Sequence, residues 1–137
     1  MRTRQIRPTK SEFEYELHLY NMYDEIRDKY FILFDFRTTK IFRSFLYRIN
    51  VDVINNSEKN ELEFNVEGLS APNFSLTDGG YANYQYQFFH FSKNDINVKF
   101  MKNGVFSFNY IFRFRNKSME IVKKSRKNFI NIIIHKN

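Results

Sequence analysis

The chain has 137 residues, no cysteine, and 22 Lys and Arg against 15 Asp and Glu, which gives a formal charge of +7. This length fits one domain that buries about two thirds of its unfolded surface. The lack of thiols excludes disulfides, thiolate metal ligands and thiol redox chemistry. The best candidate for an apolar span, 129–134, is short and contains Asn131, so we expect no membrane-spanning helix. Glu12, Glu14 and Glu16 lie where a signal peptide would be apolar, which favours a cytoplasmic protein.

The positive charge is concentrated at the two ends of the chain. Residues 1–10 contain four cations and no acid, and residues 113–137 contain eight cations against the single Glu120. The ends sum to +11, whereas the body between them sums to −4. Cationic ends on a folded body predict an anionic partner: a nucleic acid, a membrane surface or an acidic protein face. The cations assigned to this partner are Arg2, Arg4, Arg7, Lys10, Arg113, Arg115, Lys117, Lys123, Lys124, Arg126 and Lys127.

Aromatic residues make up 19% of the chain, with 17 Phe and 9 Tyr, whereas Gly (4) and Pro (2) are scarce. Phe, Tyr, Ile and Val favour strands over helices. Alternation of apolar and polar residues with period two, the primary signal for half-buried strands, recurs along most of the chain. The sequence therefore predicts a β-rich domain.

Six segments carry this alternation, and the first three lie in the N-terminal half. Segment 13–19 has aromatic residues and leucines on one face and glutamates on the other. Segment 30–36 is nearly continuously apolar, so we expect it to be buried on both sides. Between them, apolar residues at helical spacing predict a loop or one helical turn over 20–29. Segment 45–53 is the longest predicted strand, with its apolar residues on a single face.

The next two strands flank the main irregular loop. A polar turn at 55–60 precedes segment 62–66, which is expected to bury Leu62, Phe64 and Val66. Segment 68–80 contains Gly, Pro and the Asp78-Gly79-Gly80 turn, so we expect a loop. The fifth predicted strand is 84–91.

The sixth segment is a hairpin around Asn103-Gly104. A two-residue loop would oppose Phe100 to Ser107 and so set apolar residues against polar ones along the whole ladder. A three-residue loop over 102–104, with Gly104 left-handed, pairs apolar residues with each other, and we expect this version. It pairs Phe100 with Phe106, Val98 with Phe108 and Ile96 with Tyr110, and it points Phe106, Phe108, Tyr110, Phe112 and Phe114 inward.

The chain divides into a basic extension at 1–10, a β domain at 11–116 and a basic strand or tail at 117–137. Six to eight antiparallel strands joined by short polar turns predict an all-β fold. We expect a single antiparallel β-sandwich, with a closed β-barrel as the alternative.

No residue pattern predicts catalysis, a cofactor or a metal site. Glu12, Glu14, Glu16 and His18 share one strand face, but same-face positions lie about 6.6–7 Å apart, so at most two could reach one ion. We expect a solvated face, or one paired with the basic strand that bears Arg113. The glutamates of 61–67 are interpreted in the same way. The three histidines, His18, His90 and His135, lie in different predicted elements.

Tyr84, Tyr86 and Phe88 alternate along the fifth predicted strand, and lysines lie nearby in sequence. Such a set resembles the aromatic platforms on which single-stranded nucleic acids stack. Aromatic residues that alternate along a strand are more often core residues, so we give the core interpretation more weight.

The sequence favours a non-enzymatic accessory or adaptor subunit that binds a larger protein or ribonucleoprotein assembly through its strand faces and basic ends. The first alternative is a ribosome-associated RNA-binding protein, whose affinity would fall steeply with salt. The second is a peripheral membrane protein that inserts 129–134 into an anionic surface. The third, a small-ligand barrel, requires an apolar cavity, and no small-molecule substrate is predicted.

Overall fold

The computed structural model describes residues 14–42, 47–70, 80–89, 95–115, 118–124 and 129–135, with the backbone alone at 115. In these residues the chain forms strands and turns and no helix. The strands are β1 (Tyr15–Asp24), β2 (Lys29–Phe42), β3 (Arg48–Asn56), β4 (Glu61–Ser70), β5 (Gly80–Phe88), β6 (Ile96–Lys102), β7 (Phe106–Arg115), β8 (Ser118–Lys123) and β9 (Ile130–Ile134).

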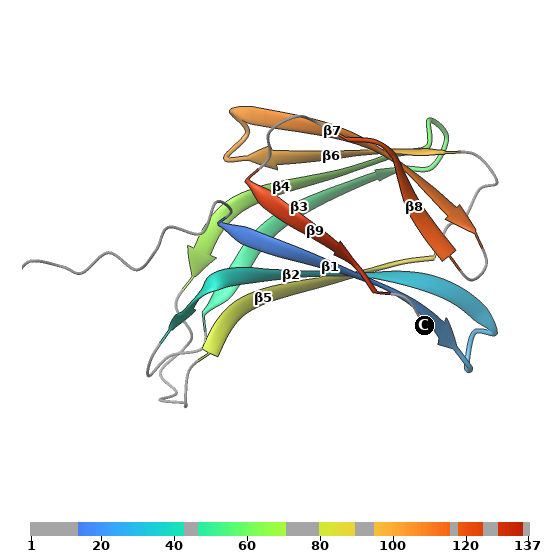
Figure 1. The fold of residues 1–137 in the computed structure, drawn as a ribbon, viewed down its shortest axis with the longest axis horizontal. Coiled ribbons are helices and arrows are strands. Elements are labelled where there is room, and N and C mark those ends of the chain that lie inside the picture. The colour runs from blue at the N-terminus through green and yellow to red at the C-terminus, as the bar shows by residue number, and fades with distance from the viewer. Residues whose placement is uncertain are drawn as a thin grey trace, which may run out of the picture.

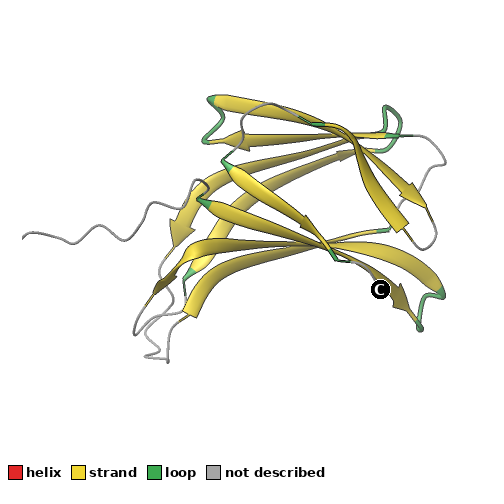
Figure 2. Ribbon diagram, in the orientation of Figure 1, coloured by secondary structure: helices red, strands yellow, loops and turns green. Residues whose placement is uncertain are grey.

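All nine described strands belong to one hydrogen-bonded sheet, in the order β8-β7-β6-β4-β3-β5-β2-β1-β9. The sheet curls until its edges, β8 and β9, face each other, so it is nearly closed into a barrel (Figure 1). Figure 2 shows that strands form the described wall of this barrel. The expected β-sandwich is therefore wrong, because the ladder is continuous from β8 to β9 and does not divide into two stacked sheets.

The sheet is also mixed rather than antiparallel. β9 runs parallel to β1, β6 runs parallel to β4, and β3 and β5 pair in parallel at Arg48 and Asn83. The expected antiparallel order assumes that strands adjacent in sequence are neighbours in space. In the structure the first and the last described strands are neighbours instead.

Side chains at alternate positions fill the barrel. β2 directs Ile32, Phe34 and Phe36 inward, and all three are fully buried. Phe31 and Asp35, on the opposite face of the strand, are covered as well. The expectation that segment 30–36 is buried on both sides is confirmed for most of it, with Leu33 part-buried and Tyr30 exposed at its start.

Aromatic rings occupy the middle of the interior. The ring centroid of Phe64 on β4 lies 5.0 Å from that of Phe34, 5.1 Å from Phe36 and 5.9 Å from Phe100. These rings come from β2, β4 and β6, which are not all neighbours in the sheet. Ring contacts therefore join opposite parts of the wall across the interior.

The β6–β7 hairpin has a three-residue loop, as expected, but the loop is 103–105 rather than 102–104. Asn103 (φ 52°) and Gly104 (φ 67°) are both left-handed, and the N–H of Val105 donates to the carbonyl of Lys102 at 3.0 Å. Because Asn103 also adopts this conformation, the turn begins one residue later than expected. The register moves by two residues and the faces stay the same. The observed pairs are Phe100 with Phe108, Val98 with Tyr110 and Ile96 with Phe112, which leaves Phe106 60% exposed at the hairpin end.

The expectation of a loop or helical turn over 20–29 is confirmed only for the turn at 25–28 and is wrong for 20–24, which belong to β1. β1 continues to Asp24, β2 begins at Lys29, and a tight turn joins them. The Asp24 carboxylate accepts hydrogen bonds from the N–H groups of Ile26 (3.0 Å) and Arg27 (3.2 Å). Asn21 points inward and is buried, and this polar residue interrupts the apolar alternation that would have marked the strand.

Candidate functional site

The sheet has two edges, and among the described residues no strand pairs with the outer side of β8 or of β9. We call the line along which these edges face each other the seam. An unpaired edge presents main-chain donors and acceptors to any extended chain that approaches it. The seam is therefore the part of the described wall most able to bind another chain.

β9 uses only alternate residues to bind β1. The N–H of Tyr15 donates to the carbonyl of Phe129 at 3.3 Å, and the N–H of His135 donates to the carbonyl of Leu19 at 2.9 Å. In a ladder of this kind the intervening residues direct their main-chain groups to the other side. The N–H and C=O groups that face the seam are therefore those of Ile130, Ile132 and Ile134.

Core side chains along the seam are incompletely covered. Met119 and Ile121 of β8 and Ile132 and Ile134 of β9 pack against the core cluster but are only part-buried. The central strands, by contrast, bury residues such as Phe64 fully. The seam thus leaves apolar surface accessible between its edges.

One end of the seam is closed by side chains. The ring of Phe129, which precedes β9, lies 5.8 Å from Phe108 of β7 and 5.9 Å, edge to face, from Tyr15 of β1. Lys102 forms an ion pair with Glu14 and places its ammonium group 6.0 Å from the centre of the Phe129 ring. These contacts join the β1–β9 side of the wall to the β6–β7 side at this end.

β8 carries an irregularity and positive charge. Ile111 of β7 pairs with Lys123, while the next residue of β7, Phe112, pairs with Ile121, so Val122 is an extra residue in β8. This bulge turns Lys123 onto the outer face beside Ile111. Lys123 and Lys124 are both exposed, and no carboxylate among the described residues forms an ion pair with either.

A polar cluster on the outer surface holds β9 against β1. His18 Nδ1 lies 2.7 Å from His135 Nε2, and His18 Nε2 lies 3.3 Å from Glu16 Oε1. The Tyr20 ring stacks on His135 with centroids 4.3 Å apart and an interplanar angle of 10°. We call His18, His135, Glu16 and Tyr20 the histidine clasp. Since the two histidine nitrogens are at hydrogen-bond distance, the N–H of one ring donates a hydrogen bond to the unprotonated nitrogen of the other.

The clasp continues onto β2 through Arg37. The guanidinium donates to the hydroxyl of Tyr20 at 3.1 Å and forms an ion pair with Asp35 Oδ2 at 2.8 Å. Burial disfavours the charge on Arg37, but the hydrogen bond and the charge of Asp35 outweigh burial and raise the pKa of Arg37. In the described residues no group of three or more histidine or acidic side chains is placed to hold a metal ion.

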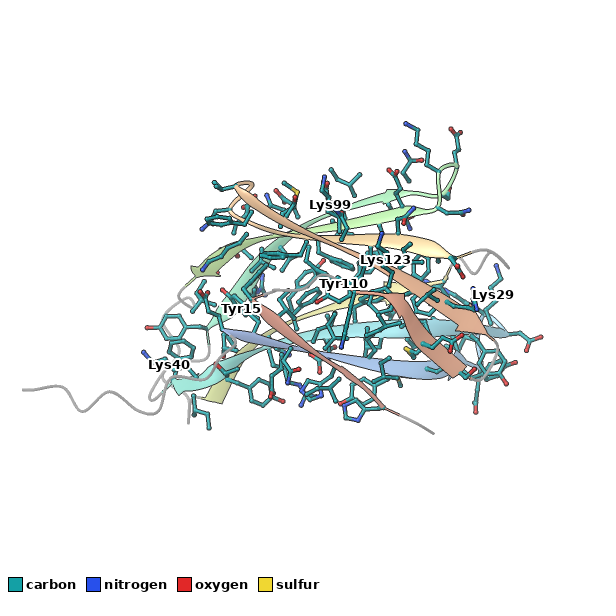
Figure 3. The ribbon with its side chains drawn as sticks, turned by 45° about the horizontal axis from the view of Figure 1, so that its top comes forward. Tyr15, Lys29, Lys40, Lys99, Tyr110 and Lys123 are labelled. Atoms are coloured by element: carbon teal, nitrogen blue, oxygen red, sulfur yellow. The ribbon has the colours of Figure 1, made fainter. Side chains whose placement is uncertain are left out.

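The structure places few of the cations assigned to an anionic partner. Seven lie outside the described residues: Arg2, Arg4, Arg7, Lys10, Lys117, Arg126 and Lys127. Lys123 and Lys124 lie together at the end of β8. Figure 3 shows Lys29 and Lys40 at opposite ends of the barrel, so the described lysines do not gather in one patch.

Arg113 is paired within the barrel wall. Its Nε donates to Asp95 Oδ1 at 2.8 Å, its NH2 donates to Asp95 Oδ2 at 3.2 Å, and Glu120 lies 3.5 Å away. The hydrogen bond to Asp95 raises the pKa of Arg113 and lowers the pKa of the Asp95 carboxyl. Two carboxylates therefore already neutralise this cation.

Tyr84, Tyr86 and Phe88 lie on the inward face of β5. Phe88 is buried, and its ring stands edge to face with Phe34 at 6.3 Å. The part-buried Tyr84 and Tyr86 pack against the core cluster, and burial raises the pKa of Tyr84. This placement agrees with the core interpretation and leaves no exposed stacking face formed by the three rings together.

In the part of the chain that the structure describes, the acidic face of β1 forms no ion pair with the basic strand that bears Arg113. Glu14 binds Lys102, Glu16 joins the histidine clasp, and Glu12 lies outside the described residues. Segment 129–134 contains β9, and its side chains Phe129, Ile130, Ile132 and Ile134 belong to the core cluster or pack against it. The described residues contain no helix that could span a lipid bilayer.

Comparisons of the chain with protein-family models, with curated proteins and with solved structures find no match. The seam and the histidine clasp are the features that sequence reasoning missed. His18 and His135 are 117 positions apart, and no local pattern relates them. The run Ile130-Asn131-Ile132-Ile133-Ile134 is the one signal in the sequence that could have indicated the free edge, because it carries no charge, proline or glycine.

Proposed function

We propose that this chain is a non-enzymatic protein-binding module, an accessory or adaptor subunit that holds an extended segment of another protein at the edge of β9. The observation that carries the proposal is the row of main-chain groups that Ile130, Ile132 and Ile134 direct into the seam. Addition of a strand to a free sheet edge is a common way for a small β domain to bind a peptide.

The interior supports this proposal better than a small-ligand function. Phe64 contacts both Phe34 and Phe100 inside the barrel, so rings occupy the space that a ligand would need. Binding on the outer wall is consistent with a filled core.

The proposal is tested by purifying the full-length protein from its native cell at low salt, with and without nuclease, and identifying co-purified proteins by mass spectrometry. Proteins that remain at constant stoichiometry after nuclease treatment support an adaptor. Loss of every partner on nuclease treatment would reject the adaptor.

RNA binding is the second candidate, and it is favoured by Lys123 and Lys124, which have no carboxylate partner among the described residues and lead towards Arg126 and Lys127 in sequence. Its measurement is the affinity for a single-stranded RNA oligonucleotide at several salt concentrations. RNA binding predicts that the logarithm of affinity falls linearly with the logarithm of salt concentration. An affinity that does not change with salt would exclude it.

A further inference from the structure

The two edges of the seam differ in how they are protected from pairing. Natural sheets blunt free edges with lysines, bulges and short strands. β8 has a bulge at Val122 and ends in Lys123 and Lys124. β9 is short as well, with five residues, but all five pair with β1 in regular register and it carries no charge, proline or bulge. β9 is therefore the edge that can accept a strand, and the opposite edge, β8, ends at the exposed Lys123, which Lys124 follows.

The side chains of the seam select for apolar residues at alternate positions of the bound segment. Met119, Ile121, Ile132 and Ile134 all point towards the core and remain part-buried. A strand lying on β9 would direct every second side chain between them. Apolar residues at these positions would remove that surface from water.

The direction of the bound segment follows from the preferred pairing of a strand added to β9 and from the closed end of the seam. Antiparallel pairing is slightly more stable per residue than parallel pairing, so a strand added to β9 is expected to run opposite to it. Its carboxyl end then lies beside Ile130. At this end Phe129 contacts Phe108, and Lys102 binds Glu14, so the seam is closed to a chain that continues. A segment that ends at this point, a carboxyl-terminal tail, fits the closed end of the seam.

The positive charge near the closed end of the seam favours acidic residues in the bound segment. Lys123 pairs with Ile111 of β7, and Phe129 contacts Phe108, three residues back along the same strand, so the end of β8 lies near the start of β9. Arg113 forms ion pairs with both Asp95 and Glu120. Lys123 and Lys124 are exposed and have no such partner among the described residues. A second copy of this chain is disfavoured, since each copy carries +7.

We propose that β9 binds the acidic carboxyl-terminal tail of a partner protein as an added antiparallel strand, with apolar residues facing Ile132 and Ile134 and carboxylates near Lys123 and Lys124. This proposal rests on the proposed function, because it specifies the segment that the adaptor would hold.

The test uses a fluorescent peptide that alternates Thr and Val and ends in two Asp with a free carboxylate. Two matched peptides serve as controls. One ends in two Lys, and the other carries the Asp pair at its acetylated amino end. Fluorescence anisotropy with the full chain measures each affinity. We expect the first peptide to bind at least about tenfold more tightly than either control. Equal binding of all three would overturn the assignment of charge and direction.

Variants of the chain test the main-chain contacts. Ile132→Pro removes an N–H that faces the seam and not β1, whereas Ile132→Ala shortens the same side chain and keeps the N–H. We expect roughly fivefold weaker binding for Ile132→Pro than for Ile132→Ala, since one hydrogen bond contributes about 1 kcal/mol. Equal affinities in two folded variants would overturn strand addition.

Amide hydrogen exchange in the unaltered chain gives an answer even if Ile132→Pro does not fold. Peptide binding should slow exchange at Ile130, Ile132 and Ile134 and leave Asn131 and Ile133 unchanged, because the latter already donate to β1. A uniform change, or none, would contradict the proposal.

Charge reversal tests the role of Lys123 and Lys124. Lys123→Glu with Lys124→Glu should invert the preference between Asp-ended and Lys-ended peptides, while Lys29→Glu with Lys59→Glu should preserve it. A different outcome would reject the tail and assign the lysines to nucleic acid. In that outcome no peptide binds, RNA binding is lost in the Lys123→Glu, Lys124→Glu double variant, and Ile132→Pro leaves RNA binding unchanged. If nuclease-resistant partners exist but no peptide binds, the adaptor stands and this docking mode fails.

Discussion

Phe64 illustrates how much of the stability of this barrel depends on single aromatic side chains. Its ring is fully buried and contacts rings from both β2 and β6. Truncation would remove apolar contact and leave a cavity whose walls belong to separate strands and cannot easily collapse.

We therefore expect Phe64→Ala to lower the free energy of unfolding by about 3–5 kcal/mol. Urea denaturation of the full-length protein provides the measurement. Phe106→Ala is the matched control, because Phe106 is 60% exposed, and its effect should stay within about 0.5 kcal/mol. Similar losses in the two variants would contradict the assignment of Phe64 to the centre of the core.

The Asp95–Arg113 pair makes stability depend on pH. Arg113 lowers the pKa of the Asp95 carboxyl in the folded chain. A carboxyl with a lowered folded pKa contributes stability above its unfolded pKa, about 3.9, and loses this contribution as the pH falls through the folded value. Asp95→Asn should therefore be less stable than the unaltered chain at about pH 7, and the difference should shrink at about pH 2. Thermal unfolding at both pH values checks this, and a constant difference would mean that charge is not the cause.

Residue-level prediction from the sequence succeeds where the cause is local. Leu62, Phe64 and Val66 are predicted to be inside because they alternate with polar residues, and they are fully buried. The hydrogen bond between His18 and His135 could not be predicted from neighbouring residues, since it exists only because β9 lies beside β1.

At the scale of elements, β9 depends on β1 for its position. Its ladder to β1 is regular, and the histidine clasp adds a hydrogen bond and a ring stack on the outer surface. Loss of the clasp should loosen this strand before the rest of the sheet, because Phe129 anchors only its other end.

We expect His135→Ala to lower the free energy of unfolding by about 1 kcal/mol, the usual contribution of one hydrogen bond. Exchange at the amides of Asn131 and Ile133 should accelerate more than exchange in β4. Gln87→Ala, an exposed change on β5, is the control and should leave both strands unaffected. An equal acceleration in β4 and β9 would indicate global rather than local loosening.

Strands are predictable as elements because period-two alternation is local, and the turn residues set most of their limits. The β6–β7 register differs from the predicted one by two residues because either position of the loop keeps the phenylalanines on one face, so side-chain pairing alone could not separate them. The prediction over 20–24 is wrong because Asn21 is a polar residue inside the barrel.

At the scale of the whole molecule, the curling of one sheet into a nearly closed barrel is the feature that could not be predicted from the sequence. Sandwich and barrel share the same inward alternation, and they differ only in which strands are neighbours. The parallel pairs β1–β9 and β4–β6 join strands that are distant in sequence, and no residue pattern in either strand specifies the other. The free edges follow from this order, so the candidate site could not be predicted without it.

The distribution of charge over the molecule separates the two candidate functions. Arg113 is neutralised within the wall, whereas Lys123 and Lys124 have no carboxylate partner among the described residues and are followed in sequence by Arg126 and Lys127. Replacement of these four by Gln removes the charge and keeps a polar side chain. RNA binding predicts a salt slope that becomes shallower by about 0.7 for each phosphate that the variant no longer neutralises.

An adaptor that uses the seam predicts a different result for the same four-fold variant. Its nuclease-resistant partners should bind more weakly, because the acids of the bound tail lose their counter-charges, but they should still co-purify, because the main-chain groups of Ile130, Ile132 and Ile134 remain. Quantitative mass spectrometry of partners and the RNA salt slope, measured on one preparation, distinguish the two cases. A changed slope with unchanged partners would assign the basic end to nucleic acid and leave the seam to protein.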